Sequence, residues 1–177
     1  MRRAVLDIET GGFSTTKNGV CEIGLLLIDE NYNIIDKFHT LIKPYKREDS
    51  EELVSYKEDA MSINGLTVER LIQQGLPVQE AMLELAKFFV HHDINTIIGH
   101  NSNAFDVPRV EYLLNRFCSF SISHVRNVDT LLIAKAKLNL PSYNLQSLCE
   151  YFGIDNKIAH SALSDAEATL EVYKKLI

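Results

Sequence analysis

The sequence lacks the features that mark membrane, secreted and disulfide-rich proteins. It has only three cysteines in 177 residues and no C-x-x-C pair, which predicts reduced thiols in a cytoplasmic protein. An unbroken apolar stretch such as residues 23–28 is far shorter than a membrane span and is typical of a buried strand. Asp7 and Glu9 interrupt the region where a signal peptide would be apolar, so we expect no secretion signal.

The sequence also has little positive charge relative to its negative charge. Lys and Arg number 18 against 24 Asp and Glu, which gives a formal charge of -6. This balance excludes a protein that coats DNA or an anionic membrane by bulk electrostatics. It does not exclude an enzyme that acts on nucleic acid, because a bound metal can supply positive charge locally.

What the sequence does have is the composition of a globular domain. Apolar residues make up 46% and charged residues 24%, and a chain of this length can bury a full core. Its composition does not change in a way that would indicate a linker. We therefore predict a single domain over residues 1–177.

Hydrophobic periodicity predicts three strands followed by alternating helices and strands. Turn-forming residues at 29–33 separate the second strand from the third and predict a hairpin. The predicted strands are Arg3–Ile8, Val20–Asp29, Asn33–Lys43, Asn95–Gly99 and His124–Val128. The predicted helices cover residues 51–61, 67–72, 77–89, 106–117, 129–137, 144–151 and 162–177.

This order of elements predicts a mixed α/β fold. We expect a five-stranded mixed sheet with three antiparallel N-terminal strands and with helices on both faces. The first strand is expected to be central, and ligands usually gather at the carboxyl end of such a strand.

Two acids end the first predicted strand. Asp7 and Glu9 are two residues apart, so the period of a strand puts both side chains on one face. A solvated strand end would explain such a pair, and so would a metal site. The apolar neighbours Val5, Leu6 and Ile8 indicate a buried segment, in which acids need partners.

Three further residues carry candidate chemistry. Asp106 follows a strand directly before a helix, where an aspartate can also simply act as a helix cap. Asp165 lies near the start of the last helix, where it can favour the helix dipole. His160 precedes Asp165 by five residues and is expected in the loop that enters this helix, either as a functional residue or as an ordinary loop histidine.

Taken together, these four carboxylates predict a site for divalent cations. If they converge at about 6 Å, each pair repels by about 2.8 kcal/mol at an effective dielectric of about 20. Two divalent ions would cancel four negative charges, and oxygen ligands favour Mg²⁺ or Mn²⁺ over zinc. Such a metal pair can activate a water beside a phosphodiester, and His160 could accept its proton.

The order of the motifs resembles that of the DEDDh 3′–5′ exonucleases. This family includes ribonuclease T and the proofreading subunits of bacterial replicative polymerases. The segment LDIETGG carries Asp7 and Glu9, IIGHNSNAFD carries Asp106, and AHSALSDA carries His160 and Asp165. The segments INGLT and VDTL also resemble family segments, so the resemblance spans nearly the whole chain.

The resemblance implies a three-layer, ribonuclease-H-like fold and the release of nucleoside 5′-monophosphates from a 3′ end. By this resemblance, Asp7 bridges two metals. Glu9 and Asp165 support the metal that activates water. Asp106 holds the second metal, and His160 is the general base.

The resemblance also implies a set of substrate-binding residues. Thr10 and Gly11 lie where the family's backbone contacts the terminal nucleotide, although the family commonly has a second threonine in place of Gly11. Phe13 lies at the position of an aliphatic wedge against the terminal base, or it packs in the core. Phe105 either stacks on a base or packs. Asn101 is expected to order the strand exit near Asp106.

The expected partner is the 3′ end of a nucleic acid, single-stranded, with no membrane involved. Whether that nucleic acid is DNA or RNA stays open at this point. Two alternatives remain beside an independent exonuclease. One is a proofreading domain that acts only with a DNA polymerase, and the other is an inactive nuclease-fold module that binds nucleic acid.

Overall fold

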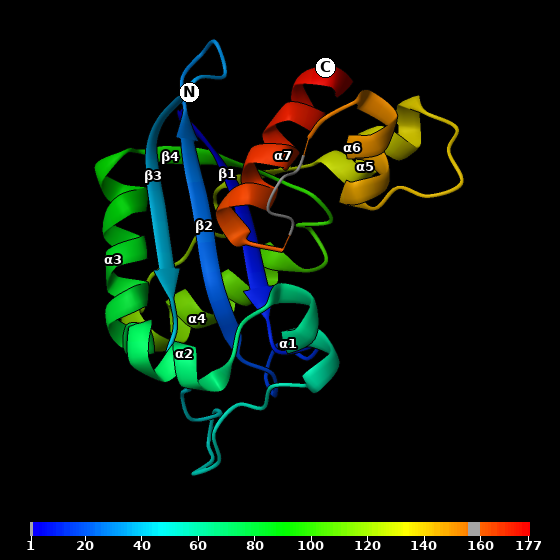
Figure 1. Ribbon diagram of the computed structural model, residues 1–177. Helices are drawn as coiled ribbons and strands as arrows, with labels where there is room; N and C mark the ends of the chain where they lie inside the picture. The colour runs from blue at the N-terminus through cyan, green and yellow to red at the C-terminus, as the bar shows by residue number, and fades with distance from the viewer. Residues whose placement is uncertain (1, 156–159) are drawn as a thin grey trace.

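The protein folds around one five-stranded sheet. The computed structural model describes residues 2–155 and 160–177. The strands run in the spatial order β3-β2-β1-β4-β5, with β1 in the centre (Figure 1). Their bounds are β1 Arg2–Thr10, β2 Val20–Ile28, β3 Ile34–Leu41, β4 Ile94–Gly99 and β5 Arg126–Asp129.

The strand pairing confirms the predicted mixed sheet. β2 pairs antiparallel with both β1 and β3, and β4 runs parallel to β1 and β5. The predicted hairpin between β2 and β3 is present. Asp29 closes it, because its Oδ1 accepts hydrogen bonds of 2.8 Å from the backbone N–H groups of Asn31 and Asn33.

Seven helices complete the described part of the chain. They are α1 Glu58–Asn64, α2 Val68–Gln74, α3 Val78–His91, α4 Asp106–Cys118, α5 Thr130–Lys137, α6 Leu145–Phe152 and α7 Ala162–Leu176. Side chains cap three of them at the N-terminus: the Thr67 hydroxyl, the Asp129 carboxylate and the Asn144 amide oxygen each accept a backbone N–H.

The predicted helix over residues 51–61 is wrong in its first half. Only α1, from Glu58, is helical. The preceding segment turns back on itself instead, with Arg47 N–H bonded to the Glu52 carbonyl at 2.8 Å and Val54 N–H bonded to the Tyr45 carbonyl at 2.9 Å. An acidic run suits a helix start, but the burial of Val54 and Tyr45 in the core decided this conformation.

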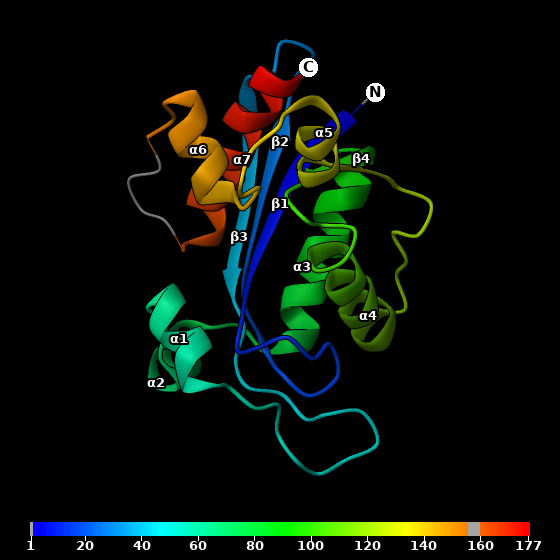
Figure 2. The same cartoon turned by 90° about the vertical axis from the view of Figure 1, so that its right-hand side faces the viewer.

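Helices cover both faces of the sheet, as predicted (Figure 2). α3 and α4 pack on one face, over apolar side chains that include Leu6 and Ile8 of β1. α7 packs on the other face against β1 and β2, with α5 and α6 beside it. Among the described residues, no helix combines the length and apolarity needed to cross a membrane.

Candidate active site

The alternation of β1 places its two acids under α7. Leu6 and Ile8 point into the core on the α3 and α4 side, whereas Val5 packs with Ala166 and Leu170 of α7. Asp7 and Glu9 share the face of Val5 because successive side chains of a strand alternate. The two acids therefore point to the same side of the sheet, as predicted, and this is the side on which α7 packs.

Asp165 meets these two acids from the first turn of α7. One carboxylate oxygen from each of Asp7, Glu9 and Asp165 lies within 4.8 Å of the other two. Asp165 is 9% exposed. Two elements distant in the sequence thus bring three carboxylates to one point at the carboxyl end of β1.

Asp106 joins the site through the backbone of β1. It is the first residue of α4 and is 3% exposed. β4 pairs with β1 only as far as Val5, and beyond that point the Asp106 Oδ1 accepts the Ile8 N–H at 3.1 Å. Asp106 is therefore held beside the stretch of β1 that carries Asp7 and Glu9, the neighbours of Ile8 in the chain.

The acids raise one another's pKa. Burial raises the pKa of Asp7 well above its ordinary value, and the charges of Asp106, Asp165 and Glu9 raise it further. Burial, and then the charge of Asp165, raises the pKa of Glu9 to about 8. Burial also raises the pKa of Asp106 to about 7. So much clustered negative charge fits a group of oxygen ligands for divalent cations.

A fifth acid, Glu22, was not predicted at this site. It lies opposite Glu9 in the pairing of β1 and β2 and is 5% exposed. Its Oε1 lies 2.6 Å from Nε2 of His39 on β3, and its charge also raises the pKa of both Asp7 and Glu9. A single acid within the otherwise apolar run of β2 was the signal that could have revealed it.

Two other polar residues support the site. The side chain of Asn64, at the end of α1, hydrogen-bonds to Glu9 and lowers its pKa, which opposes the effect of burial. Asp129 accepts the backbone N–H groups of Asn101 and Asn103 at 2.9 and 3.1 Å and so ties down the loop before α4. Asn64 lies in the segment INGLT and Asp129 in the segment VDTL, and both segments resemble segments of the family.

His160 lies next to the acids. Its backbone N–H donates to Oδ2 of Asp165 at 3.1 Å, and its φ of 71° is left-handed. The residue is exposed, and together with Asp165 it lines a cavity of about 430 Å³ beside α6. The backbone bond thus holds His160 directly beside one of the acids.

Residues 4–173 match the family described as exonuclease. The chain belongs to the exonuclease family. It is 31% identical over 173 residues to the PolC-type DNA polymerase III of Thermotoga maritima, which covers 98% of this chain but 12% of the polymerase. It is also 31% identical over 188 residues to ribonuclease T of Shewanella sp. (strain ANA-3), which covers 98% of this chain and 80% of the relative.

Solved exonuclease structures share the fold. E. coli exonuclease I in complex with a dT13 oligonucleotide superimposes with a TM-score of 0.82 at 21% identity, over 99% of this chain and 40% of that chain. The chain therefore spans less than half of exonuclease I and a small part of the PolC-type polymerases. The predicted ribonuclease-H-like fold is confirmed, and so is the predicted enzyme class at the level of the family.

Within this exonuclease domain, two predicted substrate residues lie together beside the acids. Phe13 is 82% exposed, so it is not a core residue. The half-buried Phe105 precedes Asp106, and the two phenylalanine rings meet edge to face with their centroids 6.2 Å apart. Together they form a partly open aromatic surface next to the acidic site.

The two residues that follow Glu9 have their polar groups paired within the protein. The Thr10 hydroxyl donates to the Gly12 carbonyl at 2.9 Å. The Gly11 N–H donates to the Gly19 carbonyl, and the Gly11 carbonyl accepts the N–H of Lys57, each at 2.8 Å. A nucleotide contact at Gly11 would have to use backbone groups that already have partners.

Asn101 lies in the loop between β4 and α4. It is exposed, its φ is 58°, and it lines a cavity of about 370 Å³ with His100 and Lys135. The predicted role in ordering the strand exit fits its bond to Asp129, which uses the backbone N–H. This cavity, which Leu131 and Pro141 also line, is a different one from the cavity beside Asp165.

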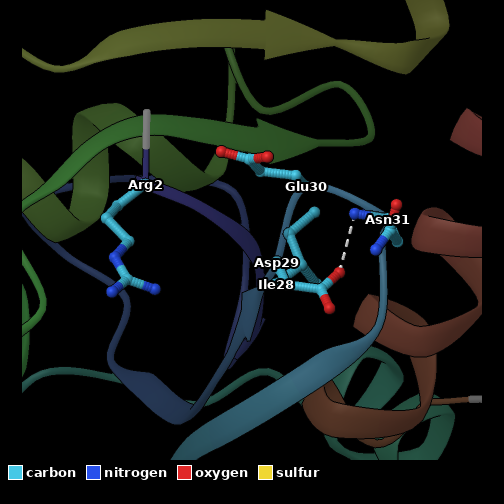
Figure 3. A pocket seen from close by; sticks show the side chains of 5 residues that line it. All are labelled: Arg2, Ile28, Asp29, Glu30 and Asn31. Atoms are coloured by element: carbon cyan, nitrogen blue, oxygen red, sulfur yellow. Dashed lines mark hydrogen bonds between the residues drawn. The ribbon is translucent and has the colours of Figure 1, made fainter.

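A cavity of about 450 Å³ lies at the opposite end of β1 from the acids, and Figure 3 shows its lining residues from close by. Because β1 begins at Arg2 and carries Glu9 near its other end, this cavity and the acidic site are separated by the length of the strand. The cavity is lined by Arg2, Ile28, Asp29, Glu30 and Asn31. Its turn residues are hydrogen-bonded to one another, as the dashed line between Asp29 and Asn31 shows.

Proposed function

We propose that this chain is a metal-dependent 3′–5′ exonuclease that acts on DNA or RNA and releases nucleoside 5′-monophosphates. The observation that carries the proposal is the convergence of Asp7, Glu9 and Asp165 within 4.8 Å in a chain of the exonuclease family. Asp106 adds a fourth buried carboxylate beside them.

The acidic cluster fits two divalent cations, Mg²⁺ or Mn²⁺. Asp7, Glu9, Asp106 and Asp165 would supply the carboxylate oxygens that hold these ions. When bound, such ions lower the pKa of a water and stabilise negative charge on phosphate oxygens. The cluster's own burial and mutual repulsion support this assignment, because unscreened carboxylates at these distances resist full ionisation.

His160 would serve as the general base. The attacking water forms a bond to phosphorus and gives its proton to the imidazole, while the bond from phosphorus to the 3′ oxygen breaks. The released 3′ oxygen takes a proton from solvent. The exposure of His160 and the bond from its backbone N–H to Asp165 support this role, because they place an exposed histidine directly beside the acidic cluster.

The substrate would be a single-stranded 3′ end. Phe13 and Phe105 would stack on the terminal base, since an aromatic face can bind any base. Solved relatives in the fold include exonuclease I bound to single-stranded oligonucleotides. Thr10, Gly11 and Asn101 remain predicted members of the substrate site.

A second candidate is a proofreading exonuclease that works together with a DNA polymerase. It is favoured by the match of 98% of this chain to part of a PolC-type DNA polymerase III. In that case activity on a mismatched primer end would depend on the presence of a polymerase.

The proposal is tested with DNA and RNA oligonucleotides blocked in turn at each end, with and without Mg²⁺ or Mn²⁺. We expect mononucleotide release that needs a metal and a free 3′ end, and we expect Asp7→Ala to abolish it. Glu84→Ala, which removes an exposed acid on α3, is the matched control and should keep full activity. Undiminished release by Asp7→Ala would overturn the assignment of the site.

A further inference from the structure

Arg109 is a buried cation beside the aromatic surface formed by Phe13 and Phe105. The residue is 5% exposed, although arginine is rarely buried. It lies in α4, and its guanidinium carbon is 3.6 Å from the centroid of the Phe105 ring. This stacking places the guanidinium plane directly against one of the two rings that we propose to contact the substrate.

The same guanidinium also joins two separate segments of backbone. Nη1 donates to the Phe105 carbonyl at 2.7 Å, and Nη2 donates to the Phe13 carbonyl. Because the donors of a guanidinium point in fixed directions, one side chain sets the position of the β1–β2 loop relative to the start of α4. The distance between the two rings therefore depends on Arg109.

Arg109 ties the β1–β2 loop to α4, whereas hydrogen bonds within the loop hold the two neighbours of Phe13. Its side chain is largely exposed, and it sits between Gly12, whose φ is 148°, and Ser14. The loop is fixed on both sides of Phe13, since Asn18 Oδ1 accepts the Ser14 N–H and the Gly12 carbonyl accepts the Thr10 hydroxyl, each at 2.9 Å. Without Arg109, the loop would lose this link to α4, so binding a base would first require the Phe13 ring to be ordered against Phe105, which weakens binding.

We propose that Arg109 is a positioning residue that preorganises the Phe13 and Phe105 rings for the terminal base of the substrate. This inference rests on the proposed exonuclease function. Arg109 does not touch the substrate and acts through the two phenylalanines. Its loss should therefore weaken substrate binding through the base and leave the chemical step unchanged.

The test compares Arg109→Lys with the wild type on two single strands, one with a normal 3′-terminal nucleotide and one whose terminal nucleotide lacks its base. Lysine keeps the charge but cannot stack and donate to two carbonyls at once. We expect KM to rise about tenfold on the normal strand with kcat unchanged, because the ordering cost returns. On the strand without a terminal base, the two proteins should have equal KM.

Arg116→Lys is the matched control, since Arg116 lies on the same helix and stacks on Phe117 at 4.6 Å, away from Phe13. It should leave KM unchanged. The double variant Phe13→Ala/Arg109→Lys should show a combined effect smaller than the product of the two single effects. A combined effect equal to the product of the two single effects would show that Arg109 does not act through Phe13.

An unchanged KM in Arg109→Lys would overturn the inference, and so would the same rise in KM on both strands. A fall in kcat alone would also overturn it, because it would place the effect at the neighbouring Asp106. The affinity for both strands, measured in EDTA by fluorescence anisotropy, separates this inference from the proposed function. If the wild type releases no mononucleotides, the proposed exonuclease function is wrong. If the wild type and Arg109→Lys bind the normal strand with equal affinity, the proposed role of Arg109 is wrong.

Discussion

At the scale of single residues, protonation of the acids is the property of the site that can be measured most directly. Burial and neighbouring charge raise the pKa of Glu9 to about 8 and that of Asp106 to about 7. Without metal, these carboxyl groups therefore keep protons at a pH where exposed acids have lost them. Bound divalent cations would oppose the raised pKa values, because their positive charge favours the ionised carboxylates.

The raised pKa of Glu9 predicts how the metal-free protein responds to pH. From pH 4.5 to about 8 the unfolded chain loses this proton and the folded protein keeps it, so Glu9 lowers the stability of the fold as pH rises. We expect Glu9→Gln to gain stability over the wild type through this range, by at most about 1.4 kcal/mol per pH unit. Urea unfolding in EDTA at several pH values measures this difference. If the stability of Glu9→Gln and that of the wild type change equally with pH, the prediction is wrong. The control Glu84→Gln should follow the pH dependence of the wild type.

His160 differs from the acids in that its removal should spare the metal site. We expect His160→Ala to bind Mn²⁺ with the affinity of the wild type and to lose turnover by about 10²- to 10⁴-fold, which is the usual contribution of a general base. Calorimetric titration with Mn²⁺ and the rate of mononucleotide release measure the two effects. Unchanged turnover would remove the assignment of His160 as the base.

At the scale of elements, the site depends on how closely α7 approaches the sheet. Gly24 of β2 lies opposite Asp7, and a Cβ there would come within 2.6 Å of the Ala162 backbone at the start of α7. The absence of a side chain thus allows the first turn of α7 to bring Asp165 to β1. A glycine in a strand often marks such a close approach of backbone.

Gly24→Ala should therefore push the start of α7 away from β1. We expect a loss of stability and at least about a tenfold loss of turnover per folded molecule, because small displacements of reacting groups are costly. Thermal unfolding and single-turnover rates measure both. Leu85→Ala is the control, since it removes a fully buried side chain on α3 and should cost about 2–5 kcal/mol of stability without changing turnover.

At the scale of the whole molecule, the charge of -6 limits how nucleic acid can be held. Two divalent cations would carry four positive charges to the acidic cluster and leave the molecule only weakly negative. The aromatic surface at Phe13 and Phe105 adds contacts that do not depend on charge. Affinity should therefore reside at the strand end and not along the length of the strand.

We expect weak affinity for long single strands. Binding should be at least about tenfold tighter in Mn²⁺ than in EDTA, and it should depend only slightly on the salt concentration. Few phosphates are neutralised by the protein itself, so the slope of log K against log salt should be small. Anisotropy with an oligonucleotide whose 3′ linkage resists hydrolysis measures this. Tight binding in EDTA with a steep salt dependence would contradict a strand-end mode of binding.

Much of the fold and of the site was predictable because it follows local rules. The alternation of β1 predicted that Asp7 and Glu9 share a face, and the strand order confirmed the mixed sheet. The start of α1 was not predictable, because the core contacts of Val54 overrode the helical preference of the acids before it. The role of Glu22 was hidden for a related reason, since only the pairing of β1 with β2 puts it opposite Glu9.

The sequence by itself determined which residue types carry the chemistry and in what order, because motifs and periodicity are local properties of the chain. Only the tertiary structure decided how they meet. The bond from Ile8 to Asp106 and the link from Arg109 to Phe13 join residues 98 and 96 positions apart. Such contacts depend on how helices pack on the sheet, and no local pattern encodes that packing.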